Sequence, residues 1–132
     1  MKIIITDDSS AYREGLKYFL NKLGGFEVIG EYCDGEELLQ STEIIDADIL
    51  LLDIVMPKID GFKAAKQLVI KYPKIKIIAV TMFQEETYLR DLIQTGFKGC
   101  VFKLNIYDEL PRAISTVMNG KLFFPENMLI EH

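Results

Sequence analysis

Cysteine and long apolar runs are scarce in this sequence. The two cysteines, Cys33 and Cys100, show neither CxxC spacing nor a metal-ligand pattern, so we expect them to be buried thiols. No apolar run reaches the roughly 18 residues that a membrane span needs. The opening residues MKIIITDD lack the long apolar segment and small-residue cleavage site of a signal peptide. These absences predict a cytoplasmic protein with no membrane association.

Basic residues are also in deficit. The 15 Lys and Arg residues face 20 Asp and Glu residues, for a net charge of −5. A domain that binds nucleic acid presents a basic face, so we expect no nucleic-acid contact by this domain itself. The 132 residues, 49% of them hydrophobic, suit one compact domain with a real core. The terminal Glu131 and His132 follow Leu-Ile without turn chemistry, and we interpret them as the remnant of an expression tag.

Short apolar runs typical of strands alternate five times with segments whose apolar residues recur at helical spacing. Asp34 and Asp60 are predicted to cap the second and third helices. Asp108 is predicted to cap the last helix, with Pro111 in its first turn and Gly120 at its end. Strands are predicted at 2–6, 26–32, 48–53, 76–81 and 99–103, and helices at 10–23, 34–40, 60–72, 85–95 and from 108 onward.

Five βα units in about 120 residues predict an α/β fold. Crossovers between parallel strands are right-handed, which leaves few topologies. The simplest is a doubly wound, flavodoxin-like (βα)5 parallel sheet with strand order 2-1-3-4-5. In such sheets ligands bind beyond the carboxyl ends of the strands, at the switch point between strands 1 and 3.

Polar side chains stand at those carboxyl ends. Asp7 and Asp8 follow the first strand, Asp53 ends the third, Thr81 the fourth and Lys103 the fifth. Three carboxylates in one pocket cannot all stay ionised without a counter-charge. Mg²⁺ supplies one, because it prefers oxygen ligands and is held by one or two carboxylates together with a phosphate. The pattern therefore predicts a magnesium site.

A carboxylate left free of the metal can attack phosphorus and form an aspartyl phosphate. Lys103, Thr81 and the metal would then contact the phosphoryl oxygens and offset their charge. Each residue also has an ordinary structural interpretation. Asp7 and Asp8 can be helix N-cap residues, Asp60 a cap only, Thr81 a strand end and Lys103 a surface lysine.

Taken together, these residues resemble the receiver domain of two-component response regulators. The resemblance extends from residue 2 to about 120 and rests on Asp7-Asp8, the stretch DIVMPKIDG at 53–61, Thr81 and Lys103. The chain most resembles receivers attached to helix-turn-helix outputs, because of Leu104 and the late segment AISTVMNGKLFFPENM. We expect a receiver domain at 1–124, and at 125–132 a tail that combines the start of a linker with the tag remnant.

The resemblance implies a role for each site residue. Asp53 would accept the phosphoryl group, and Mg²⁺ would be bound by Asp8, Asp53 and the backbone carbonyl of Val55, with Asp7 acting mainly through a metal-bound water. Thr81 and Lys103 would contact the phosphoryl group. A histidine kinase would be the donor, and the face of helix 4, strand 5 and helix 5 would change to control an output, with a second copy as the expected partner and transcription as the expected output. Such a domain is no conventional enzyme.

Three positions depart from the family pattern. Receivers usually carry an aromatic residue at the position of Cys100, a small residue at that of Met82 and a proline at that of Leu104. We therefore expect a different aromatic coupling between the phosphate and the output face. We also predict that Val55 and Phe83 shield the phosphate from water and prolong its lifetime.

Other functions are weaker alternatives. The chain could be a stand-alone receiver that acts by protein–protein interaction. A Mg²⁺-dependent phosphatase similar to haloacid dehalogenases would need a second aspartate where Val55 stands, and 132 residues leave no room for a cap domain. A flavodoxin-like cofactor binder would need a phosphate loop after the first strand, where Asp7 and Asp8 would repel a phosphate.

Overall fold

The computed structural model describes residues 1–56, 58–82 and 86–125. The predictions that lie outside these residues are the role of Phe83, the start of the fourth helix at residue 85, and the tail beyond residue 125 with its tag remnant at Glu131 and His132. The elements are β1 (Lys2–Thr6), α1 (Ser10–Leu23), β2 (Glu27–Tyr32), α2 (Gly35–Leu39), η1 (Ile44–Asp46), β3 (Ile49–Asp53), α3 (Gly61–Lys71), β4 (Ile77–Thr81), α4 (Glu86–Thr95), β5 (Gly99–Phe102), η2 (Lys103–Asn105) and α5 (Ile106–Met118).

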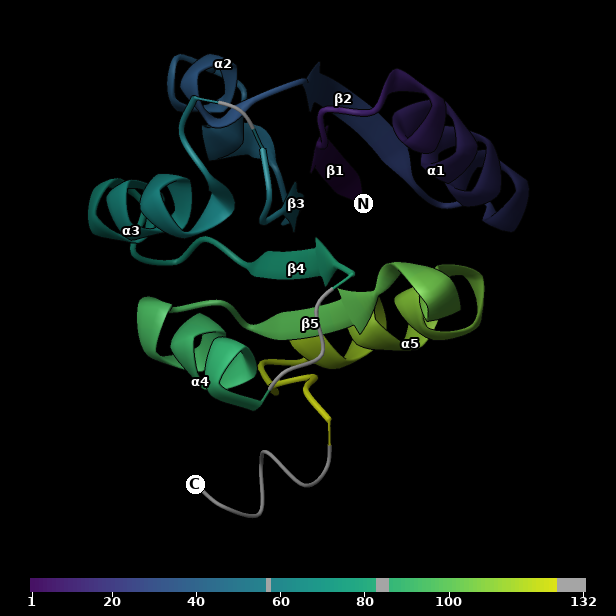
Figure 1. The fold of residues 1–132 in the computed structure, drawn as a ribbon. Helices are drawn as coiled ribbons and strands as arrows, with labels where there is room; N and C mark the ends of the chain where they lie inside the picture. The colour runs from purple at the N-terminus through teal and green to yellow at the C-terminus, as the bar shows by residue number, and fades with distance from the viewer. Residues whose placement is uncertain (57, 83–85, 126–132) are drawn as a thin grey trace.

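The strands form one parallel sheet in the order β2-β1-β3-β4-β5. Helices α1 and α5 cover one face, and α2, α3 and α4 cover the other (Figure 1). This confirms the predicted doubly wound fold. Because all strands run in the same direction, their carboxyl ends meet at one edge, where the loops to the following helices begin.

Both faces of the central strands are buried, as expected for a parallel sheet. In β3 the side chains of Ile49 and Leu51 face the α1 and α5 side, whereas Leu50 and Leu52 face the other helices. All four are at most 1% exposed. This alternation divides the core into two layers, one on each face of the sheet.

The helix caps at Asp34 and Asp60 are confirmed. Each carboxylate accepts a hydrogen bond from the backbone N–H three residues later, at 2.8 Å for Glu37 and 2.9 Å for Lys63. Helix α1 is capped by Ser9, whose hydroxyl accepts from the Tyr12 N–H. The N-cap interpretation of Asp7 and Asp8 is therefore wrong.

The start of α5 differs from the prediction. Strand β5 ends at Phe102, Lys103 opens the short helix η2, and α5 begins at Ile106 rather than at Asp108. Ile106 is 2% exposed, so burial of its side chain favours an earlier helix start. Asp108 consequently lies inside the first turn, and Pro111 lies beyond that turn, within the helix.

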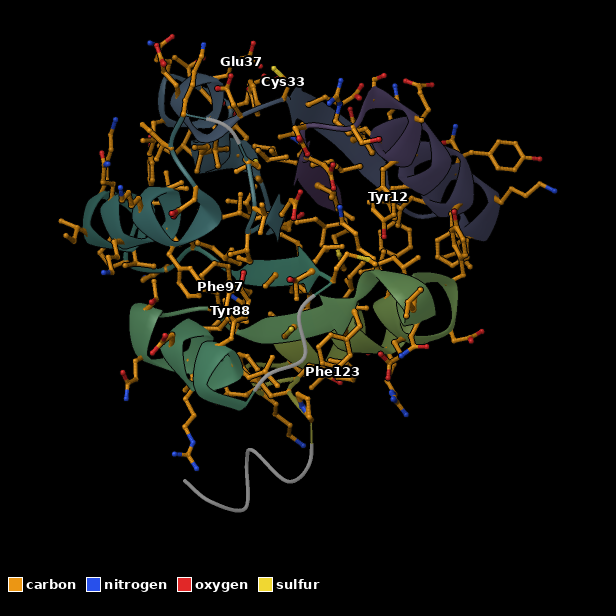
Figure 2. The ribbon with its side chains drawn as sticks, in the orientation of Figure 1. Tyr12, Cys33, Glu37, Tyr88, Phe97 and Phe123 are labelled. Carbon is orange, nitrogen blue, oxygen red and sulfur yellow. The ribbon has the colours of Figure 1, made fainter. Side chains whose placement is uncertain are left out.

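Cys100 is buried as expected, whereas Cys33 is only half-buried, and both thiols are free. Cys33 follows β2 at the surface beside α2, where its backbone N–H donates to the Glu37 carboxylate (Figure 2). Among the described residues, no helix is long and apolar enough to cross a membrane.

Candidate functional site

The carboxylates of Asp7, Asp8 and Asp53 meet at the carboxyl edge of the sheet. One oxygen from each lies within 4.8 Å of the others, a spacing that suits a common cation. Asp7 and Asp53 are 2% and 6% exposed, whereas Asp8 is open to solvent. The cluster therefore has a buried floor and an accessible side.

Asp7 is fixed by three interactions. Its Oδ1 accepts from the Ser9 N–H at 2.9 Å, and its Oδ2 lies 2.8 Å from Nζ of Lys103. Its backbone carbonyl accepts a short hydrogen bond from the Arg13 guanidinium. These contacts hold the carboxylate against the site instead of at the helix cap.

Lys103 connects the ends of β1 and β3. Its ammonium lies 2.8 Å from Asp7 and 3.5 Å from Asp53, and its side chain is 17% exposed. Burial lowers the pKa of Lys103, but hydrogen bonds and charge attraction from Asp7 and Asp53 outweigh this and raise it. Lys103 is therefore a fixed cation of the site and not a surface lysine.

Tyr12 is a neighbour of the site that sequence reasoning missed. The Lys103 ammonium lies 4.5 Å from the centroid of the Tyr12 ring, a cation–π geometry. Figure 2 shows Tyr12 on the side of α1 that faces the strands. In the sequence Tyr12 is only one of the apolar positions of an amphipathic helix. Its place four residues after Asp8, in the first turn of the helix that follows the acidic pair, is the feature of the sequence that could have indicated a position beside the site.

Asp53 is an electrostatically strained carboxylate. Burial, followed by repulsion from Asp7, raises its pKa to about 6, against the opposing effects of Lys103 and the Val55 N–H. A divalent cation would relieve this repulsion, because it adds positive charge where the carboxylates crowd. Three converging carboxylates fit a hard, oxygen-binding ion such as Mg²⁺.

The loop after β3 passes very close to Asp53. The Gly61 N–H donates to the Ile54 carbonyl at 2.8 Å. A Cβ at Gly61 would lie 2.6 Å from the Asp53 carbonyl oxygen, so only glycine fits there. The neighbouring Val55 is 57% exposed at the mouth of the site, and its carbonyl as a metal ligand stays a prediction.

Thr81 closes β4 and is 1% exposed. It pairs with Phe102 of β5, while the preceding Val80 pairs with Asp53 of β3. The Thr81 hydroxyl also interacts with Tyr88 of α4: burial raises the pKa of Tyr88 to about 12, and the hydrogen bond from Thr81 opposes this shift. Thr81 therefore lies between the acidic cluster and α4.

The structure thus brings every predicted site residue to one edge. The Lys103 ammonium lies 2.8 Å from a carboxylate oxygen of Asp7 and 3.5 Å from one of Asp53. Asp8 completes the acidic cluster, and Thr81 ends β4, the strand next to β3. Asp60 stands apart as a helix cap.

Comparison with known proteins gives consistent results. Residues 3–115 match the model of the response regulator receiver domain. The chain is 33% identical over 120 residues to the transcriptional regulatory protein DegU of Brevibacillus brevis, and 35% identical over 124 residues to the oxygen regulatory protein NreC of Staphylococcus aureus. These matches include 91% and 93% of this chain but 51% and 57% of the relatives, so the chain spans about half their length.

The solved structures agree with this. The isolated receiver domain of RcsB from Salmonella enterica serovar Typhimurium, in its apo form, superposes with a TM-score of 0.89 at 29% identity. The match covers 100% of this chain and 99% of that one. With its sheet order, its acidic cluster and these matches, the chain belongs to the response regulator receiver domain family, a family of signalling domains.

Proposed function

We propose that the chain is a phosphorylation-dependent switch that accepts a phosphoryl group on Asp53 from a histidine kinase. The observation that carries the proposal is the convergence of Asp7, Asp8 and Asp53 within 4.8 Å, with the Lys103 ammonium between Asp7 and Asp53. This arrangement supplies a nucleophile, a cation site and a fixed positive charge. It also leaves one side open to a donor.

In the transfer, a carboxylate oxygen of Asp53 forms a bond to phosphorus while the phosphorus–nitrogen bond of a phosphohistidine breaks. The bonding pair returns to the imidazole nitrogen of the donor. With a pKa of about 6, Asp53 is mostly ionised at neutral pH, which the attack requires. Lys103 and Thr81 are placed to receive the charge that develops on the phosphoryl oxygens.

Mg²⁺ would be held by Asp8, Asp53 and the Val55 carbonyl, with Asp7 acting through a bound water. When bound, the ion offsets the negative charge of the carboxylates and the phosphoryl group. Asp7 is already occupied by Lys103 at 2.8 Å, which agrees with an indirect role toward the metal. Asp8 is the exposed member of the cluster and so the one that an arriving hydrated ion meets first.

The switch would act through the α4, β5 and α5 face. A phosphoryl group on Asp53 competes with Asp7 for the Lys103 ammonium and offers a new partner to the Thr81 hydroxyl. Because Lys103 follows β5 and Thr81 ends β4 beside α4, these two side chains connect the site to that face. The face would exist in two conformations, and phosphorylation of Asp53 would shift the equilibrium toward one of them.

We propose a second copy of the chain as the partner at that face, and transcription control as the output of the whole protein. Two observations support this: the relatives include a transcriptional regulatory protein of about twice this length, and a solved structure describes RcsB dimers bound to DNA. A stand-alone receiver is the alternative output, and a Mg²⁺-dependent phosphatase is disfavoured by Val55. The cytoplasmic location stays a prediction.

Acetyl phosphate and intact-mass measurement test the phosphorylation step. The protein with Mg²⁺ should gain one phosphoryl group, and the Asp53→Asn variant should gain none. Asp60→Asn is the matched control, because Asp60 is a nearby aspartate that only caps α3 and asparagine caps equally well. A mass gain that persists in Asp53→Asn would refute the assignment.

A further inference from the structure

The segment 121–125 lies along the free edge of the sheet. The Phe123 N–H donates to the Lys98 carbonyl at 3.0 Å, and the Cys100 N–H donates to the Phe123 carbonyl at 2.8 Å. Together they form an isolated parallel bridge between Gly99 and Phe123. The segment therefore pairs the Cys100 N–H of β5 and the Lys98 carbonyl just before it, groups that an edge strand otherwise leaves open.

Two successive aromatic residues hold the segment on opposite faces of the sheet. Phe123 packs against the α1 and α5 layer, with the Arg112 guanidinium 5.2 Å from its ring centroid. Phe124 is 7% exposed and belongs to the other layer, together with Cys100. Figure 2 shows Phe123 beside β5 at this edge. Successive side chains of the segment thus alternate between the two faces of the sheet, as in a strand, and pack in both core layers beside β5.

The same strand leads directly to the site. Cys100, which bonds the segment, precedes Lys103 by three residues. Phe102, between them, pairs with Thr81 on the inner side of β5 and lines a cavity of about 430 Å³ with Cys100 and Phe124 on the outer side. Strand β5 is therefore the direct main-chain connection between Lys103 and the docked segment.

We infer that segment 121–125 is a catch, docked on β5 while Asp53 is unphosphorylated and loosened when Asp53 carries a phosphoryl group. The inference rests on the proposed function and adds to it a regulatory element outside the site. The docked arrangement occurs together with a Lys103 ammonium bound to Asp7 and Asp53. In this inference both arrangements belong to one state, so a phosphoryl group that draws Lys103 away weakens docking, and docking in turn opposes phosphorylation by the same factor.

The Cys100 thiol is a built-in reporter of this catch. It is 3% exposed and shares its layer with Phe124, so loosening of the segment should expose it. A Cys33→Ser variant leaves Cys100 as the single cysteine. Its reaction with an aromatic disulfide reagent, followed with and without acetyl phosphate and Mg²⁺, measures opening, while the intact mass of the same samples measures phosphorylation.

We expect phosphorylation to accelerate the Cys100 reaction by about five-fold or more, the lower end of typical coupling between sites. The Asp53→Asn variant in the same background should show no acceleration. Phosphorylation without any change in thiol reactivity would overturn the catch and leave the proposed function standing. Absence of a mass gain would overturn both.

A second pair of variants tests the role of the segment. Phe124→Ala should raise the Cys100 reactivity of the unphosphorylated protein to near the phosphorylated level and speed phosphorylation by acetyl phosphate. Leu122→Ala is the matched control, because Leu122 is in the same segment but 41% exposed, and it should change neither rate. Equal rates for Phe124→Ala and Leu122→Ala would refute the inference.

Discussion

Replacement of Asp8 by asparagine is the sharpest test of the acidic cluster. Two unit charges 4.8 Å apart repel by about 3 kcal/mol at an effective dielectric constant near 20, and by about 1 kcal/mol in water. Asp8 is exposed and Lys103 offsets part of the charge, so the lower value applies. In chelator, Asp8→Asn should therefore raise the stability by about 1 kcal/mol.

A gain of this size corresponds to a rise in Tm of about 3–5 °C for a domain of this length. With Mg²⁺ at about 100 times its Kd, the free energy of unfolding of the unchanged protein should rise by about 3 kcal/mol. For Asp8→Asn the same addition of Mg²⁺ should raise it by much less. Thermal unfolding by circular dichroism, with and without Mg²⁺, measures both effects.

Asp60→Asn serves as the control for this experiment. It also removes one negative charge, but from the cap of α3, where asparagine replaces aspartate at little cost. Its Tm in chelator should hardly change, and its stabilisation by Mg²⁺ should persist. If Asp8→Asn in chelator melts no higher than the unchanged protein, the three carboxylates do not repel one another as the geometry requires.

Three further predictions concern the loop, the core and the mouth of the site. Gly61→Ala should lower the free energy of unfolding in urea by about 1–3 kcal/mol, because its Cβ would lie 2.6 Å from a backbone oxygen. Gly15→Ala, inside α1, should be neutral or stabilising, because its Cβ would meet only the hydroxyl of Tyr107 at 3.3 Å, and that exposed side chain can shift. Burial raises the pKa of Cys100 from 9.0 to about 12, so the protonated thiol stabilises the fold below pH 9, and this contribution is lost as the pH rises toward 12. The difference in the free energy of unfolding between the unchanged protein and Cys100→Ala should therefore shrink over that pH range. A constant difference would contradict the assignment. Val55→Asn should shorten the lifetime of the phosphoryl group on Asp53 several-fold if this exposed apolar side chain hinders water, and an unchanged decay of the phosphorylated mass would exclude that role.

The departure at Cys100 now has a structural counterpart. A thiol stands where the resemblance leads us to expect an aromatic side chain, and two aromatic residues lie close to it: Phe124 in the same core layer, and Phe102 on the same face of β5. Tyr88 of α4 packs edge to face with Phe62 at 5.1 Å in that layer and interacts with Thr81. Tyr88 of α4 and Phe102 of β5 thus place aromatic side chains beside Thr81, and Phe124 of the segment after α5 places one beside Cys100.

The order of the elements could be deduced from the sequence alone. Apolar runs of strand length alternating with helical periodicity are local signals, and the right-handed crossover rule reduces them to a few sheet orders, of which the simplest is the one observed. The caps at Asp34 and Asp60 are local too, because each side chain bonds a backbone group only three residues away. The same logic placed Asp7, Asp8, Asp53 and Thr81 at one edge.

Other features depended on contacts between distant residues. Ile106 starts α5 ahead of Asp108 because its side chain is buried beneath the sheet, and no local pattern records that burial. The position of Tyr12 over Lys103, and the docking of Phe123 and Phe124 across β5, join residues far apart in the chain. Local periodicity and strand order thus determine which side chains reach the site, whereas tertiary packing decides which of them touch and how the site is connected to the rest of the fold.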